Sequence, residues 1–174
     1  DSEGTKIGMG WPERFDVIEW IKLIISWDSN AQIILHGVSM GAATVLMASG
    51  EELPENVKVI IADCGYTSEW DEFKCEANAL HIPWFPVLNA ASVLSRLRDG
   101  YDFKQASALE KVKQSRIPTL FIHGSDDELV PYSMLDKLYS AAACEKECLT
   151  VNGAGHALSS SVEPELYWNT VESF

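Results

Sequence analysis

The sequence has little positive charge and lacks any long apolar run. Its 174 residues include 13 lysines and arginines against 26 aspartates and glutamates, which gives a formal net charge of −13. Such a chain would repel a phosphate backbone, so we expect no nucleic-acid partner. No apolar run approaches the ~20 residues that a membrane-spanning helix needs. The N-terminus also lacks the basic and apolar regions of an export signal, so we expect a cytoplasmic protein without a membrane segment.

Cysteine is scarce as well. The four cysteines, Cys64, Cys75, Cys144 and Cys148, are too few for a disulfide scaffold, and no pair has the CxxC spacing of a zinc site. We therefore expect free thiols and no bound metal. The composition, with 47% hydrophobic and 22% charged residues, is that of a globular protein. A chain of this length buries roughly 70% of its unfolded surface, so residues 1–174 are expected to form one domain.

Apolar runs and helical periodicities alternate along the chain. Continuous apolar runs, typical of parallel strands covered on both faces, occur at residues 31–37, 57–63 and 118–124, with a weaker run at 147–151. Apolar residues at helical spacing occur at residues 12–27, 40–50, 133–143 and 164–174. We expect the first of these helices to be well buried. The alternation predicts an α/β fold, with a mostly parallel sheet and helices on both faces.

The connection between Asp63 and Pro118 is far longer than the usual link between a strand and the next element. It has no strand pattern but holds several aromatic residues: Trp70, Phe73, Trp84, Phe85 and Tyr101. We predict that residues 67–115 form a helical cap inserted into the α/β domain.

A GxSxG pentapeptide, Gly37 to Gly41, lies between a predicted strand and a predicted helix. A sharp turn at this place would expose Ser39 above the sheet and strain its backbone toward positive φ, and the two glycines would relieve the crowding. The following helix would direct its N-terminal amides at the site, so the Met40 amide is a candidate oxyanion donor. The alternative is that Ser39 is merely a small residue at a tight turn.

A serine hydroxyl becomes a strong nucleophile only beside a base that a carboxylate orients. His156 lies in a glycine-flexed loop after the last predicted strand. Asp126 and Asp127 follow the strand at residues 118–124, at the end of the sheet where α/β proteins build their sites. Asp63 ends another strand and is an alternative acid.

Three other side chains lie near the ends of predicted strands. His36 and His123 each precede a glycine, where a structural histidine is expected. Cys64 follows Asp63, so it could line a pocket or be a buried structural thiol.

Three segments, LHGVSMGAAT, LFIHGSDDELVP and VNGAGHALS, closely resemble motifs of the α/β-hydrolase superfamily. The resemblance is closest to bacterial serine hydrolases of the prolyl-oligopeptidase-like and serine-aminopeptidase-like branches. It implies Ser39 as nucleophile, Asp127 as triad acid and His156 as base, with no cofactor. The implied reaction is hydrolysis of a carboxylic ester or thioester of a small molecule. The alternative is hydrolysis of a short peptide by a serine peptidase.

The sequence departs from this superfamily because a complete hydrolase sheet has more strands than the four predicted here. Residues 2–4 resemble the end of the glycine-rich turn that follows the family's fourth strand, so we expect the N-terminal strands to be missing. The loop that supplies the second oxyanion amide would be missing with them, at a cost of roughly 10² to 10³ in rate. An inactive fragment or a non-catalytic interaction module is therefore a further alternative. The strand at residues 31–37 would have an unpaired edge, through which we expect self-association.

Overall fold

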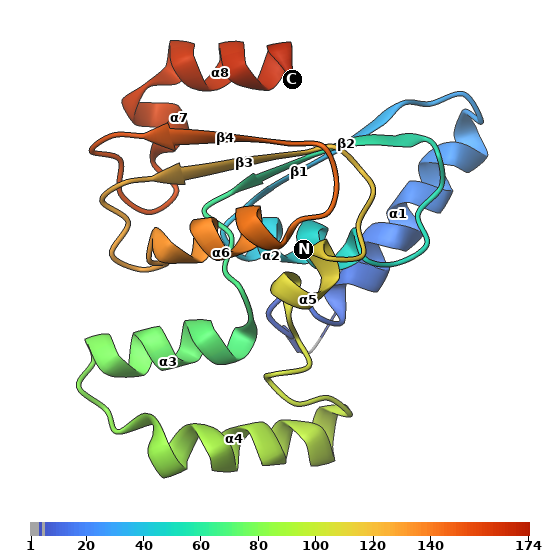
Figure 1. Ribbon diagram of the computed structural model, residues 1–174. Coiled ribbons are helices and arrows are strands. Elements are labelled where there is room, and N and C mark those ends of the chain that lie inside the picture. Colours follow the sequence, from blue (N-terminus) through green and yellow to red (C-terminus); the bar gives the residue numbers. More distant parts are fainter. Residues whose placement is uncertain (1–3, 5) are drawn as a thin grey trace.

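The computed structural model describes residue 4 and residues 6–174 (Figure 1). The predicted glycine-rich turn at residues 2–4 lies outside the described residues except for Gly4. The strands are β1 (Ile33–Val38), β2 (Val57–Asp63), β3 (Thr119–Gly124) and β4 (Lys146–Val151). The helices are α1 (Glu13–Trp27), α2 (Met40–Ala48), α3 (Glu69–Ala79), α4 (Trp84–Asp99), α5 (Ala108–Val112), α6 (Ser133–Ala141), α7 (Ser159–Val162) and α8 (Pro164–Ser173).

The four strands form one parallel sheet in the order β1-β2-β3-β4. Val38 pairs with Asp63, and Gly124 pairs with Val151. The carboxyl ends of all four parallel strands therefore lie at the same end of the sheet, called here the carboxyl edge. The predicted α/β fold is confirmed, and each predicted strand is found within two residues of its expected start. The loops that carry the candidate site residues therefore leave the sheet side by side.

Helices cover both faces of the sheet, as predicted. One layer contains α1, α2, α5 and α6, and the other contains α7 and α8 (Figure 1). Helix α2 is the most deeply buried, because Ala42 to Ala48 are all inaccessible or nearly so. On the opposite face Tyr167 of α8 packs against Ile61, Leu120 and Ile122. The sheet is thus held between two apolar layers.

The outer strand β1 is not covered on both faces, contrary to the sequence prediction. Ile33 and Leu35 are buried against the α1 and α2 layer, whereas Ile34 is 60% exposed and Val38 is 42% exposed. Helix α8 reaches this strand through a hydrogen bond of 2.9 Å between Tyr167 Oη and His36 Nε2. An apolar run indicates burial but does not reveal which neighbours the strand has, and this is why the prediction was wrong on one face.

Helix α1 is also less buried than expected. Arg14 and Ile21 are its buried residues, while Trp20 is 61% exposed and Trp27 is 72% exposed. The helix packs against α2 at the outer side of the sheet, so only one stripe of it has a partner.

Three helices lie between β2 and β3, in the segment predicted as a cap. Helices α3 and α4 lie apart from the sheet, side by side and antiparallel to each other, and are called here the α3–α4 hairpin, whereas α5 packs against α2 (Figure 1). The segment leaves and rejoins the body at one place, where Ser68 and Ser107 form an antiparallel bridge. Each serine also caps a helix, because its hydroxyl accepts the N–H of Asp71 or of Glu110.

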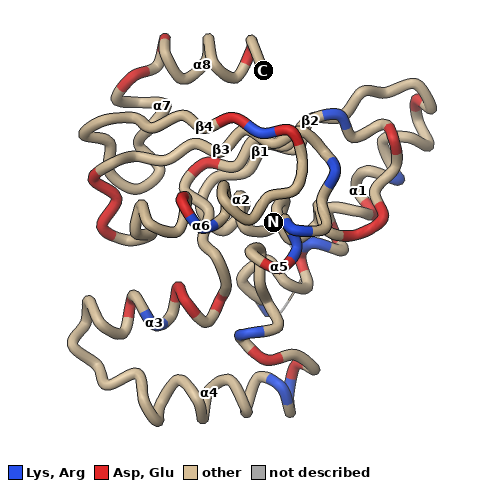
Figure 2. Tube along the Cα trace, in the orientation of Figure 1, with Lys and Arg blue, Asp and Glu red and all other residues tan. Residues whose placement is uncertain are grey.

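Acidic residues are scattered along the chain of the body, whereas the middle of α4 contains no charged residue (Figure 2). Within the part of the chain that the structure describes, no helix is both long enough and apolar enough to cross a membrane.

Candidate active site

Ser39 lies at the sharp turn between β1 and α2, with φ 56° and ψ −119°. A positive φ costs a non-glycine residue on the order of 1–3 kcal/mol, so neighbouring contacts must hold it. The Ser39 N–H donates to the Asp63 carbonyl of β2 at 2.8 Å, and the Ser39 carbonyl accepts the Ala43 N–H at 3.0 Å. The predicted strain is therefore present and is held by the next strand and the next helix.

The two glycines of the pentapeptide are not equivalent. A Cβ added at Gly37 would lie 2.3 Å from the Gly41 carbonyl oxygen, so only glycine fits there. A Cβ added at Gly41 would meet nothing within 4 Å outside its own helix. Relief of crowding, which the sequence suggested for both positions, is a property of Gly37 in the structure.

The structure brings together Ser39, His156 and Asp127 as one hydrogen-bonded chain. His156 Nε2 lies 2.8 Å from Ser39 Oγ, and His156 Nδ1 lies 2.8 Å from Asp127 Oδ2. A carboxylate can only accept, so Nδ1 donates to Asp127 and leaves the Nε2 lone pair facing the serine hydroxyl. This is the arrangement in which an imidazole can take a proton from a serine.

The Asp127 side chain is fully buried, and both of its oxygens have partners. Oδ1 accepts the N–H groups of Leu129 and Val130 at 3.0 and 2.9 Å. The Nε2 atom of His123 lies 3.2 Å from Oδ2 of Asp127 and 2.9 Å from the Val130 carbonyl oxygen. Burial raises the pKa of Asp127, but hydrogen bonds from His123, His156 and Val130 outweigh it and hold that pKa below its usual value. The carboxylate is thus charged at neutral pH.

Neither alternative acid contacts His156 in the structure. Asp126 is exposed, and its carboxylate accepts the Ser125 hydroxyl at 2.6 Å. Asp63 is buried and accepts the Ser159 hydroxyl at 3.3 Å. Burial raises the pKa of Asp63, and hydrogen bonds from Tyr167 and Ser159 offset this only in part. The geometry therefore favours Asp127 among the three carboxylates.

Met40 is the first residue of α2, directly after Ser39. The first N–H groups of a helix have no partner within the helix, so the Met40 amide is free to face an oxyanion beside Ser39. Its role as an oxyanion donor stays a prediction.

The structure shows which neighbours His123 has and that Cys64 is buried, whereas the sequence left both points open. His123 is the structural histidine that was expected, and it also faces the candidate acid. Cys64 is 1% exposed, and its backbone has φ 47°. Burial raises the pKa of its thiol to about 12, so the thiol is protonated at neutral pH. Its position at the end of β2 is the signal that placed it near the site, and all four cysteines are free, as predicted.

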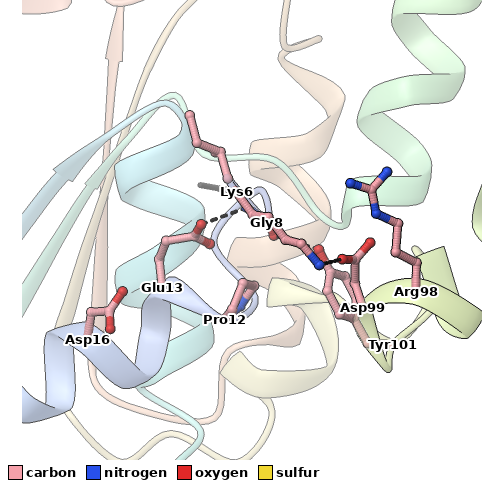
Figure 3. A pocket seen from close by; sticks show the side chains of 9 residues that line it. Lys6, Gly8, Pro12, Glu13, Asp16, Arg98, Asp99 and Tyr101 are labelled. Atoms are coloured by element: carbon pink, nitrogen blue, oxygen red, sulfur yellow. Dashed lines mark hydrogen bonds and ion pairs between the residues drawn. The ribbon is translucent and has the colours of Figure 1, made fainter. Parts of the chain in front are cut away.

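Two cavities lie away from these residues. One of about 460 Å³ is lined by residues before α1, by the first turn of α1, by the end of α4 and by Tyr101, and it contains the Lys6–Asp99 ion pair (Figure 3). The other, of about 360 Å³, lies between α3 and α4 and is lined by Phe73, Ala77, Ile82, Pro83, Trp84, Val87, Leu88, Ala91 and Phe103. Ser39, Asp127 and His156 line neither cavity, so volume alone does not point to the candidate site.

Known proteins resemble the chain in sequence and in fold. A model described as the prolyl oligopeptidase family matches residues 11–170. The protein YqkD of Bacillus subtilis is 29% identical over 175 residues, which cover 99% of this chain and 57% of the relative. Lysophosphatidylserine lipase ABHD12 of Macaca fascicularis is 29% identical over 144 residues, which cover 82% of this chain and 35% of the relative. This chain therefore spans little more than half of the first relative and about a third of the second.

Among solved structures, the esterase Pf2001 of Pyrococcus furiosus matches with a TM-score of 0.73 at 19% identity. The match covers 98% of this chain and 63% of the esterase chain. At this identity the likeness shows the fold.

Proposed function

Because the chain belongs to the prolyl oligopeptidase family and has the α/β-hydrolase fold, we propose that it cleaves a carboxylic ester or thioester through an acyl-enzyme on Ser39. The observation that carries this proposal is the pair of 2.8 Å hydrogen bonds that link Ser39 to His156 and His156 to Asp127. The three residues come from loops after β1, β4 and β3, so their meeting is a product of the fold and not of sequence proximity.

In the proposed reaction Ser39 Oγ attacks the substrate carbonyl while His156 Nε2 accepts the hydroxyl proton. The Met40 N–H stabilises the oxyanion that forms. His156 then gives the proton to the leaving alcohol or thiol, and the acyl group stays on Ser39. A water molecule attacks the acyl-enzyme in the same way and releases the acid. Asp127 keeps the other ring proton on Nδ1, so that Nε2 is the atom that accepts the serine proton and then returns it.

The relatives support an ester as the substrate. Pf2001 is an esterase, and ABHD12 is named a lysophosphatidylserine lipase. We further propose that the α3–α4 hairpin is the cap and that its apolar cavity accommodates uncharged parts of a small-molecule ester. The net charge of −13 disfavours anionic substrates.

A serine peptidase that acts on short peptides is the second candidate, and the name of the matched family favours it. Both reactions use the same three residues, so the triad geometry does not choose between them. A non-catalytic module that keeps the fold is the third candidate, and it predicts no turnover of either substrate.

Steady-state kinetics on nitrophenyl esters and aminoacyl anilides, with the wild-type chain and Ser39→Ala, separate these candidates. Ester hydrolysis that Ser39→Ala abolishes supports the proposal. Faster anilide hydrolysis favours the peptidase. No turnover of either substrate by the folded wild-type chain contradicts both enzyme proposals. Ser26→Ala is a matched control, because Ser26 is an exposed serine of α1.

We also propose that the chain self-associates through the edge of β1, the strand predicted at residues 31–37. In the described sheet β1 pairs with β2 on one side only, and Ile34 beside that edge is exposed. Light scattering at tens of micromolar should give a mass above that of one chain, and a clean monomer would contradict this. The expected cytoplasmic location stays a prediction.

A further inference from the structure

Three side chains with metal-binding atoms converge beside the candidate triad. The Cys64 Sγ, a carboxylate oxygen of Asp127 and a ring nitrogen of His156 all lie within 4.8 Å of one another. They come from the loops after β2, β3 and β4, which are neighbours in the sheet. We call these residues the Cys64 cluster. Their positions in the sequence are so far apart that no spacing motif could have revealed them.

Cys64 is held firmly in this position. Its N–H donates to the Ile122 carbonyl of β3 at 2.9 Å, and the residue is 1% exposed. Its left-handed backbone costs a non-glycine residue energy, so the position is set by the surrounding strands rather than by local preference. The sulfur therefore does not depend on a flexible loop for its place beside Asp127 and His156.

We propose that the Cys64 cluster binds a thiophilic divalent cation, Zn²⁺ being the probe of choice, and that this binding switches the hydrolase off. The inhibitory part rests on the proposed role of His156 as the base. The metal-binding part stands on the cluster alone.

The donor set suits zinc. Sulfur, imidazole nitrogen and carboxylate oxygen are all zinc ligands, and tetrahedral coordination places such atoms roughly 3.4 Å apart, so side-chain movements on the order of 1 Å would close the site. The thiolate and the carboxylate together carry two negative charges, which neutralise a divalent cation in a buried place. Mg²⁺ and Ca²⁺ prefer oxygen ligands, so the cluster should discriminate against them.

Metal binding would stop the reaction at His156. If the metal takes Nδ1, the ring proton moves to Nε2, which then donates to Ser39 and can no longer accept its proton. If the metal takes Nε2, it occupies the lone pair that Ser39 needs. In either case the Cys64 thiol releases one proton to solvent as the metal–sulfur bond forms, and no electron is transferred.

Calorimetric titration of Zn²⁺ tests the binding without reference to catalysis. It compares the wild-type chain, Ser39→Ala, Cys64→Ser and the exposed-thiol control Cys148→Ser. We expect one Zn²⁺ per chain in the wild type, in Ser39→Ala and in Cys148→Ser. We expect at least about tenfold weaker binding in Cys64→Ser. No binding to the wild type, or equal binding to Cys64→Ser, would overturn the proposal.

A chain in which Cys75, Cys144 and Cys148 are serine supplies a second measurement, in case Cys64→Ser does not fold. Cd²⁺ added to this chain should give the ultraviolet absorption of a cadmium–thiolate bond, and the absence of this absorption would overturn the proposal.

Inhibition is measured separately, as the rate at which a fluorophosphonate labels the wild-type chain in the presence of Zn²⁺, of Mg²⁺, or of Zn²⁺ together with a chelator. We expect Zn²⁺ alone to slow labelling at least about tenfold. Tight Zn²⁺ binding with unchanged labelling would overturn the inhibition but keep the site. No labelling without metal would contradict the proposed function instead.

Discussion

The carboxyl edge of the sheet and the α3–α4 hairpin differ in whether buried polar atoms have hydrogen-bond partners and whether apolar side chains are covered. At the sheet edge both oxygens of Asp127 accept hydrogen bonds, and the strained backbone of Ser39 is tied to β2. In the hairpin Glu69 and Glu72 are each 3% exposed, yet the Oε2 atom of each has no hydrogen-bond partner among the described residues.

The hairpin also leaves apolar side chains uncovered. The exposed apolar residues of α4 and the turn before it are Leu80, Ile82, Phe85, Val87, Val93, Leu94 and Leu97. Parallel strands have hydrogen-bonded neighbours that fix their register, whereas α3 and α4 pack chiefly against one another. The comparison shows that many contacts between neighbouring elements fix the structure of the sheet and its helices, whereas few contacts fix the structure of the hairpin. Four predictions test this difference.

The largest expected effect is on catalysis at the sheet edge. Asp127→Asn should lower ester hydrolysis about 10⁴-fold, because an amide would favour the wrong imidazole tautomer. Asp126→Asn is the matched control and should change the rate less than about threefold, because Asp126 contacts Ser125 and not His156. Equal losses in the two variants, measured as kcat/KM, would contradict the assignment of Asp127.

The next effect is on stability at the elbow. Gly37→Ala should lower the free energy of unfolding by about 3 kcal/mol, because its Cβ would collide with the backbone of Gly41. Gly41→Ala should be neutral or stabilising by up to about 1 kcal/mol, because alanine favours a helix and its Cβ meets no neighbour. Urea unfolding of the two variants measures the difference. Equal unfolding midpoints would show that the elbow is not tightly packed.

The third effect is a pH dependence that belongs to the hairpin. Burial, together with the nearby charges of Glu13 and Asp99, raises the pKa of Glu69 to about 8. Burial, with Glu76 and Asp127 nearby, raises the pKa of Glu72 to about 8. At a pH between the ordinary glutamate pKa and about 8, Glu69 and Glu72 are therefore protonated in the folded chain and ionised in the unfolded chain. Stability should fall as pH rises through this window, by on the order of a few kcal/mol.

Urea unfolding at about pH 5 and about pH 8 measures this slope. Glu69→Gln and Glu72→Gln should each flatten it, because an amide does not ionise. Glu128→Gln, on an exposed loop residue, is the control and should leave it unchanged. Slopes in the two hairpin variants that match the wild type would contradict the account of the buried carboxylates.

The smallest effect concerns the uncovered face of α4. Leu97 is 80% exposed, so Leu97→Ser should change the free energy of unfolding by less than about 0.5 kcal/mol. Leu88, on the same helix, is 7% exposed and lines the apolar cavity, so Leu88→Ser should cost at least about 2 kcal/mol. Similar losses in the two variants, measured by urea unfolding, would mean that Leu97 is covered in solution.

Sequence patterns predicted the sheet-based part well for physical reasons. Apolar runs gave the strands because most of this parallel sheet is buried. The loops after those strands gave Ser39, His156 and three candidate acids, and the resemblance to α/β-hydrolases implied Asp127 among them. The exposed Ile34, the contact of His123 with Asp127 and the burial of Glu72 depend on tertiary neighbours. Cys64 lies beside Asp127 and His156 because β2, β3 and β4 are neighbours in the sheet, and local sequence patterns do not reveal the order of strands. The hairpin was expected as a helical insertion, but its unpartnered atoms were not.

Intact-mass detection of fluorophosphonate labelling tests the central claim, that the carboxyl edge of the sheet activates Ser39. The probe reports an activated serine whatever the natural substrate. We predict one adduct on the folded wild-type chain, one on Ser26→Ala and none on Ser39→Ala. No adduct on the folded wild-type chain, or an adduct that persists in Ser39→Ala, would contradict the account.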